Sequence, residues 1–282
     1  MKKHIIIAVA ICLLVPMAVF AHQPRIPDGN QISVPEPEIS KAYYSQLKGS
    51  PHTYTIVSDK PFALYVNVLV PDIEGQKKDV SAVIVNDGHT ESPLAKLDGN
   101  KFTWTKFFEP FGYDSYWMGP EYKASVSAGR YDITVSSANN DSKYSIAIGE
   151  AENFNFKEVM NALSLIPTLK RDFFNESPAG FIFSPFGWGL ALIMFVLSFV
   201  FGFLYRLILR RVSRNSVRKV HKNIGTKDRL LRAILGIGLF VLAITTSWNP
   251  ILLFVSGFVI FEAIFSWCGL YAALGKSTCP LN

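Results

Sequence analysis

The stretch of sequence that decides the fold reads PFGWGLALIMFVLSFVFGFLYRLILRR and covers residues 185–211. Its apolar part is interrupted only by Ser198, Tyr205 and Arg206. An apolar run of about 20 residues is long enough to cross the roughly 30 Å hydrocarbon layer of a bilayer as a helix. We therefore predict a transmembrane helix at residues 185–209 that divides the chain into an outer part and an inner part.

A basic segment follows this apolar run. Between Arg206 and Arg232 the chain has 10 Lys and Arg residues and one acidic residue, Asp228. Lys and Arg directly after a membrane span are retained on the cytoplasmic side. The sequence thus predicts a basic cytoplasmic loop at residues 210–222 in a multi-pass protein of the inner membrane, with its N-terminal domain outside and its C-terminus in the cytoplasm. Because no aromatic residues interleave with these charges, nucleic acid is not an expected partner.

The N-terminus has the pattern of a secretory signal peptide over residues 1–21. Lys2 and Lys3 precede an apolar run, and Ala21 ends a small-residue cleavage site. An uncleaved anchor is the alternative. The next segment, residues 22–42, contains four prolines and is predicted to be an extended linker.

Residues 43–150 show a period of two. The segments Phe102–Phe107 and Tyr131–Val135 alternate between apolar and polar side chains, and turn residues separate the apolar runs. Several short strands without a long helical period are typical of an antiparallel β-sandwich. From residue 22 to 184 the chain has 15 Lys and Arg against 20 Asp and Glu, and no cysteine. This domain is therefore expected to depend on its apolar core and not on disulfides.

The end of this domain has a family resemblance. The segments AGRYDITV at 128–135 and KYSIAIG at 143–149 resemble the last two strands of small β-sandwiches found at the ends of secreted peptidases and in carbohydrate-binding modules. Members of those families bind calcium, sugars or no known ligand. The resemblance therefore implies a fold and carries no site residue over to this chain.

An aromatic stretch at residues 107–122 allows two interpretations. It is either a long loop that folds over the sandwich edge and completes the core, or a recognition surface for an unknown extracytoplasmic ligand or protein. The candidate ligand surface consists of Phe111, Tyr113, Tyr116 and Trp117. A calcium site could use three nearby carboxylates, although the Asp-x-Asp-x-Asp spacing is missing; these are Glu109, Asp114 and Glu121.

The segment 151–178 changes to a helical period, with Phe156, Val159, Met160 and Leu163 on one face. Directly before a membrane span, this pattern predicts a juxtamembrane amphipathic helix on the outer membrane surface. Packing of the same face against the β-sandwich is the alternative.

Two further apolar runs follow the basic loop, with helices expected at about 229–247 and 251–274 around the turn Trp248-Asn249-Pro250. The predicted fold class is therefore an extracytoplasmic β-sandwich domain followed by an all-α transmembrane region of three helices. The lipid bilayer is the expected partner of this region.

The last sixty residues carry two motifs, NIGTKDRLLRAILG at 223–236 and CGLYAALGKSTCP at 268–280. They resemble the two-helix inner-membrane domain of the YgaP type, a family of largely unknown function, over residues 223–282. Members occur alone or fused to other modules, including rhodanese sulfurtransferases, and the resemblance implies a homodimer through the C-terminal helices. The chain departs from the family at Gly269, where proline is usual. No rhodanese-like catalytic loop is present in the sequence, so sulfur transfer is not inherited.

Three residues of the C-terminal region are candidates for chemistry. Cys268 and Cys279 form a candidate thiol pair at the expected cytoplasmic boundary, with a spacing that is not a zinc or haem pattern. A structural role and a redox, persulfide or metal-handling role both remain open. Glu262 is a candidate intramembrane acid, with no Lys or Arg expected at its depth. It is either functional or bonded to Ser256, Ser266 or a dimer partner.

The sequence shows no catalytic constellation, no phosphate-binding loop and no metal-ligand spacing among its histidines. We therefore expect a protein that is not an enzyme and has no cofactor. The first hypothesis is an extracytoplasmic β-sandwich that binds or senses something, anchored by the YgaP-type domain. The alternatives are a thiol- or sulfur-linked membrane protein that uses the two cysteines, and an envelope transport subunit with Glu262 in the path.

Overall fold

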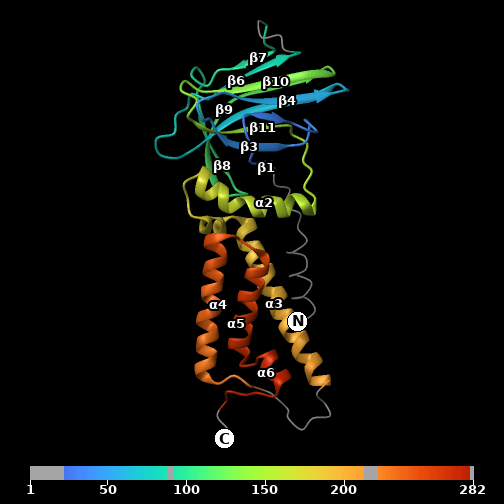
Figure 1. Cartoon of the computed structure of the whole chain (residues 1–282), viewed down its shortest axis with the longest axis vertical. Coiled ribbons are helices and arrows are strands. Elements are labelled where there is room, and N and C mark those ends of the chain that lie inside the picture. Colours follow the sequence, from blue (N-terminus) through green and yellow to red (C-terminus); the bar gives the residue numbers. More distant parts are fainter. Residues whose placement is uncertain (1–21, 88–91, 213–221, 280–282) are drawn as a thin grey trace.

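The computed structural model describes residues 22–87, 92–212 and 222–279. The predicted signal peptide and most of the predicted basic loop lie outside these residues. Figure 1 shows a β-domain at one end, a bundle of helices at the other, and the helix α2 lying crosswise between them. The chain therefore consists of a β-domain and a helical region, in the order that the sequence predicts.

The β-domain is a sandwich of two mixed sheets. The six-stranded sheet has, in spatial order, β1 (Gln23–Arg25), β3 (Lys41–Gln46), β11 (Lys143–Ile148), β5 (Phe62–Pro71), β9 (Asp114–Val126) and β8 (Thr105–Glu109). The five-stranded sheet has β2 (Gln31–Ser33), β4 (His52–Ser58), β10 (Gly129–Ser136), β6 (Ser81–Asn86) and β7 (Ala95–Leu97). The expected antiparallel pairing holds except at β1 with β3 and at β2 with β4, which are parallel.

The core between the sheets comes from the alternating side chains of the strands. In β10, Tyr131, Ile133 and Val135 are buried, while the residues between them are half-buried. A fully buried aliphatic or aromatic side chain stabilises a fold by about 1.5–3 kcal/mol relative to an exposed one. The period of two therefore explains both the strands and the face that each strand buries.

Two segments differ from the prediction. Residues 22–42 do not form a linker, because β1 and β2 add one edge strand to each sheet. Pro24 is compatible with its place in β1, since an edge strand leaves one side of its backbone unpaired, and the other three prolines lie between the strands. The aromatic stretch is not a loop either. It forms the antiparallel pair β8 and β9, whose turn contains Tyr113 with a φ of 62°.

The helix predicted within residues 151–178 forms as α2 (Phe156–Thr168), followed by a π-helical turn, η1 (Leu169–Phe173), and a 3₁₀ helix, η2 (Pro178–Phe183). Asn155 caps α2 by accepting a hydrogen bond from the Glu158 backbone N–H. One face of α2 is buried against the rest of the protein, whereas Phe156 at its start is 80% exposed.

The helical region contains α3 (Pro185–Val212), α4 (Thr226–Thr246), α5 (Pro250–Phe265) and α6 (Gly269–Leu274). Two of these, α3 and α4, are long and apolar enough to cross a membrane, whereas α5 is an apolar helix of 16 residues. The expected helix at 251–274 is therefore interrupted. The interruption occurs at Ser266, whose left-handed backbone (φ 53°) ends α5.

Small residues allow the helices to pack closely, with α5 between α3 and α4. A Cβ atom at Gly257 of α5 would lie 2.4 Å from the Ser198 hydroxyl of α3. A Cβ at Gly202 of α3 would meet the ring of Phe261, and one at Gly236 of α4 would meet Ile260. Such contacts are typical of helices that pack within a membrane.

Candidate functional site

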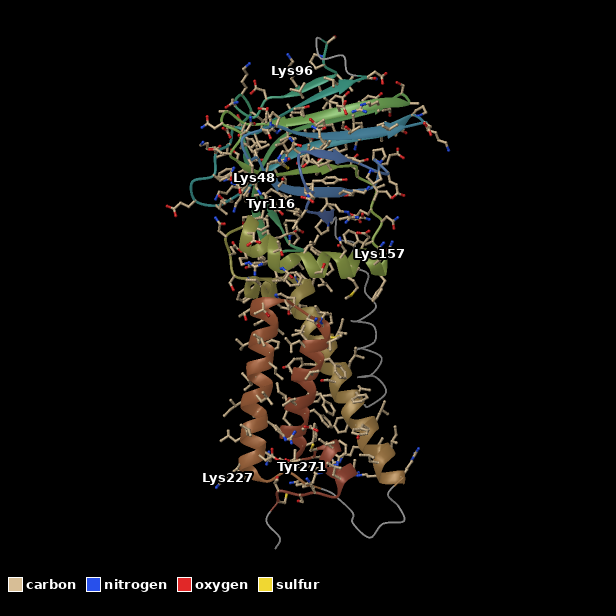
Figure 2. All side chains as sticks on the ribbon, in the orientation of Figure 1. Lys48, Lys96, Tyr116, Lys157, Lys227 and Tyr271 are labelled. Atoms are coloured by element: carbon tan, nitrogen blue, oxygen red, sulfur yellow. The ribbon has the colours of Figure 1, made fainter. Side chains whose placement is uncertain are left out.

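The four aromatic residues predicted to form one ligand surface are separated by the structure. Tyr116 is 4% exposed and its hydroxyl lies 3.0 Å from that of Tyr44, on the side of the β-domain that faces α2 (Figure 2). Trp117 lies on the opposite face of β9, where its indole N–H donates to Asp72 and the Lys78 ammonium lies 3.3 Å from the ring centroid. Neighbouring strand residues point to opposite faces, so these two rings do not share a surface.

The other two aromatic residues belong to the turn between β8 and β9. Phe111 packs against Phe186 at the start of α3, with ring centroids 4.3 Å apart, and lies 6.4 Å from Phe181 of η2. Tyr113 is exposed and contacts Phe108 and Phe183. The turn thus connects the β-domain to the helical region, a role that the sequence did not indicate.

A buried apolar cluster continues this contact into the helices. Trp248 is fully buried, donates its indole N–H to the Pro178 carbonyl at 2.8 Å and lies edge-on to Phe181 at 4.9 Å. The same cluster includes Ile166 of α2 and Leu253 of α5, with Phe111 packed against it. Side chains from the β-domain, α2, η2 and the bundle therefore form one packed unit, which we call the junction.

A charged group lies beside the junction. The side chain of Lys170, in η1, is 1% exposed. Its ammonium donates to Asp114 Oδ1 at 2.6 Å, to the Tyr113 carbonyl at 3.0 Å and to Glu176 Oε2 at 3.3 Å. An ammonium has three donors, so these three acceptors use all of them. Burial raises the pKa of Asp114 to about 6, although Lys170 opposes this rise.

Glu109, at the end of β8, is a second acid in this region and is half-buried. Its carboxylate accepts hydrogen bonds from the backbone N–H groups of Phe111 (2.6 Å) and Gly112 (2.7 Å). Burial raises the pKa of Glu109 to about 7, against the opposing effect of these two bonds. Within the described ranges, no Lys, Arg or His forms an ion pair with Glu109.

A cavity of about 150 Å³ adjoins these acids. It lies between the β-domain and α2, and its lining comes from β1, β3, β8, the turn, β9, α2 and η1, together with His22. Of the carboxylates considered for calcium, Glu109 and Asp114 line it, whereas Glu121 is exposed and accepts a hydrogen bond from Tyr65. No group of three or more His, Cys, Asp or Glu side chains in the described part of the chain is arranged to hold a metal.

Glu262 has a cationic partner, which corrects the expectation that none lies at its depth. Arg232 Nη1 of α4 is 2.5 Å from Glu262 Oε2 of α5, and Arg232 Nε is 3.0 Å from Asp228 Oδ1. Glu262 also accepts a hydrogen bond from the Gly269 backbone N–H. The packing of α4 on α5 brings Arg232 and Glu262 together. Their contact could not be predicted from the sequence, because the two residues are 30 positions apart on different helices.

The two cysteines belong to the second C-terminal motif, where Cys268 directly precedes α6 and Cys279 follows it. The label Tyr271 in Figure 2 marks α6, at the end of the bundle away from the β-domain. Both cysteines are free thiols; Cys268 is buried and Cys279 is partly exposed. The Asn223 side chain donates to the Cys268 carbonyl at 2.8 Å and accepts from the Cys268 backbone N–H at 2.7 Å. Thr278 donates its backbone N–H to the Asn223 carbonyl and its hydroxyl to Asp228. The two C-terminal motifs therefore hold each other in place.

Comparison with known proteins identifies the C-terminal region. Residues 220–282 match the family model described as "Inner membrane protein YgaP-like, transmembrane domain". This confirms the resemblance that the motifs indicate. No curated protein matches the chain.

Two solved structures are similar to part of the chain. The pre-peptidase C-terminal domain of collagenase from Bacillus anthracis is 10% identical, with a TM-score of 0.27, over 44% of this chain and 96% of that one. The copper-binding protein CorA of Methylomicrobium album BG8 is 9% identical, with a TM-score of 0.24, over 45% of this chain and 100% of that one.

Proposed function

We propose that this protein is a non-enzymatic, multi-pass inner-membrane protein that binds or senses a ligand through its β-domain outside the cytoplasm. In this proposal α3, α4 and α5 cross the bilayer, and the basic residues after α3 keep that end in the cytoplasm. The family match at residues 220–282 and the apolar α3 and α4 support the membrane location.

The observation that carries the proposal is the packing of the Phe111 ring against the rings of Phe186 and Phe181. A β-domain that is only tethered to a membrane has no need of a packed contact with the helices. Here the turn, η2 and Trp248 share one apolar cluster. A change in the conformation of the β8–β9 hairpin would therefore directly alter the contacts at the ends of α3 and α5.

The outer lipid surface is part of the proposed setting. Phe156 and Met160 of α2 are exposed, and α2 lies crosswise at the end of the bundle (Figure 1). Exposed apolar side chains at this level favour contact with the headgroup region. For a homodimer through the C-terminal helices, α4 offers more exposed apolar surface than α5, because α5 is covered on two sides whereas α4 exposes apolar side chains along its length.

Hydrogen exchange of the full-length protein in nanodiscs tests the coupling. Phe111→Ala should increase exchange in residues 178–184 and 246–250, while the β10 and β11 backbones stay protected. Phe102→Ala, which removes an exposed aromatic side chain of the β-domain outside this contact, is the matched control and should leave those segments unchanged. Equal exchange in the Phe111 variant and the wild type would show that the contact does not couple the two parts.

Labelling of cysteines tests the orientation. In spheroplasts, a membrane-impermeant maleimide should modify a cysteine introduced at the exposed Asn100 and should modify Cys279 only after detergent is added. The opposite pattern would overturn the topology.

Both alternatives have less support. A reactive thiol needs an exposed, electropositive position, whereas Cys268 is buried. Glu262 is paired with Arg232 and bonded to the backbone of Gly269, so its bonds are those of a structural residue that joins α4 to α5.

A further inference from the structure

We infer that the cavity between the β8–β9 hairpin and α2 binds a small organic ammonium compound, whose charged head pairs with Glu109 and whose short apolar body lies against α2. This inference rests on the proposed binding role and names the ligand class for the β-domain. It concerns residues outside the segment matched by the YgaP-like family.

The walls of the cavity are mainly apolar. Phe107 and Phe111 come from the hairpin, and Ala162, Ile166 and Leu169 come from α2 and η1. A cavity of about 150 Å³ has the size that accommodates one benzene ring in an engineered apolar site. The apolar body of the ligand is therefore limited to roughly six to eight non-hydrogen atoms.

The charge of the cavity favours a cation over an anion or a neutral molecule. Lys170 has given all its donors to Asp114, Glu176 and the Tyr113 carbonyl, so it is not available to an anionic ligand. Each oxygen of Glu109 accepts one backbone N–H and keeps a further lone pair. A partly buried carboxylate without an ion-pair partner is costly, and an ammonium group supplies that partner.

Several ionisable groups surround Glu109. Asp114 of β9 adds negative charge, and Lys170 of η1 opposes it. Tyr44 of β3 and His22 also line the cavity; burial raises the pKa of Tyr44 far above neutral and lowers that of His22. Both side chains are uncharged near pH 8, where Glu109 and Asp114 are ionised and Lys170 offsets one of these two negative charges.

The test measures ligand binding to the full-length protein in nanodiscs by calorimetry at pH 8. The probes are benzylammonium and n-butylammonium, with benzyl alcohol as the neutral compound of the same shape. We expect both ammonium compounds to bind, and benzyl alcohol to bind at least tenfold more weakly. Lowering the pH to 6 should weaken ammonium binding at least tenfold, because the pKa of Glu109 is about 7 and that of Asp114 is about 6, so both carboxylates lose negative charge.

Two variants locate the site. Glu109→Gln should weaken ammonium binding at least tenfold, whereas Glu121→Gln, which removes an exposed carboxylate of β9, should leave it unchanged. Ala162→Leu fills the cavity and should abolish binding while Glu109 stays intact. Absence of ammonium binding, equal binding of benzyl alcohol, or binding that survives in the Glu109 variant would each overturn the inference. None of these results would affect the exchange experiment on Phe111, so the two proposals fail separately.

Discussion

Replacing Glu109 by Gln is expected to stabilise the protein above neutral pH, because the change removes a partly buried negative charge. Burial raises the pKa of this carboxyl from 4.5 to about 7. A rise of one pKa unit on folding corresponds to about 1.4 kcal/mol. The ionised Glu109 carboxylate therefore lowers the free energy of unfolding by about 3 kcal/mol at pH 8. The glutamine side chain can accept hydrogen bonds only through its amide oxygen, so one of the two backbone hydrogen bonds to Glu109 is lost. This loss offsets about 1 kcal/mol of the gain in stability.

The sign of the pH dependence follows from proton binding. Between pH 4.5 and about 7 the native state of the wild type holds more protons than the unfolded state, so its free energy of unfolding falls as the pH rises. The glutamine variant lacks this slope. Its net advantage of about 2 kcal/mol at pH 8 should raise the unfolding temperature by about 4–8 °C and should nearly disappear at pH 5.

The assay is thermal unfolding of the full-length protein in detergent micelles at pH 5 and pH 8, followed by tryptophan fluorescence. Glu121→Gln is the matched control; its carboxylate is exposed, so the same substitution should change the unfolding temperature little at either pH. A Glu109 variant that is equally destabilised at both pH values would refute the reasoning, because it would show that burial does not penalise the charge.

The remaining predictions concern the ion pair, the helix packing and the thiols. Lys170→Met should lower the free energy of unfolding, measured by urea titration, by about 3–5 kcal/mol, because it leaves Asp114 buried and unpaired. Adding Asp114→Asn should restore much of the lost stability, because it removes the unpaired charge. Gly257→Val should cost about 1–3 kcal/mol, seen as a lower unfolding temperature in micelles, because its Cβ would lie 2.4 Å from a side-chain oxygen of α3. In single-cysteine variants, Cys279 should react with a maleimide at least tenfold faster than the buried Cys268; equal rates would contradict the burial.

Local patterns were sufficient to predict most of the architecture. The alternation in Tyr131–Val135 follows from a sheet with one buried face, and the apolar run at 185–209 follows from the thickness of a bilayer. Residues 22–42 were harder, because their proline content resembles that of a linker and their pairing depends on strands that follow later in the chain.

The candidate site depended on contacts between distant residues. Glu109 and Asp114 stood out in the sequence as carboxylates in an aromatic stretch, but Lys170 comes from a helical segment 56 residues after Asp114. The pairing of Arg232 with Glu262 depends on how α4 and α5 are aligned, which no local pattern reports. Strand alternation separates Tyr116 from Trp117, and the period of two could have shown this had the stretch been recognised as a strand.

The position of α5 between α3 and α4 also sets an order for co-translational assembly. Gly202 and Gly236 lie on helices that are synthesised before α5. Each glycine leaves space into which a side chain of α5 packs. Until α5 is synthesised, the spaces at both glycines are unfilled, and α3 and α4 lack the helix that packs between them. The closing bonds of Thr278 to Asn223 and Asp228 form later still. The packing of the bundle is thus complete only after residues 260–278 have been synthesised, although α3 and α4 precede them.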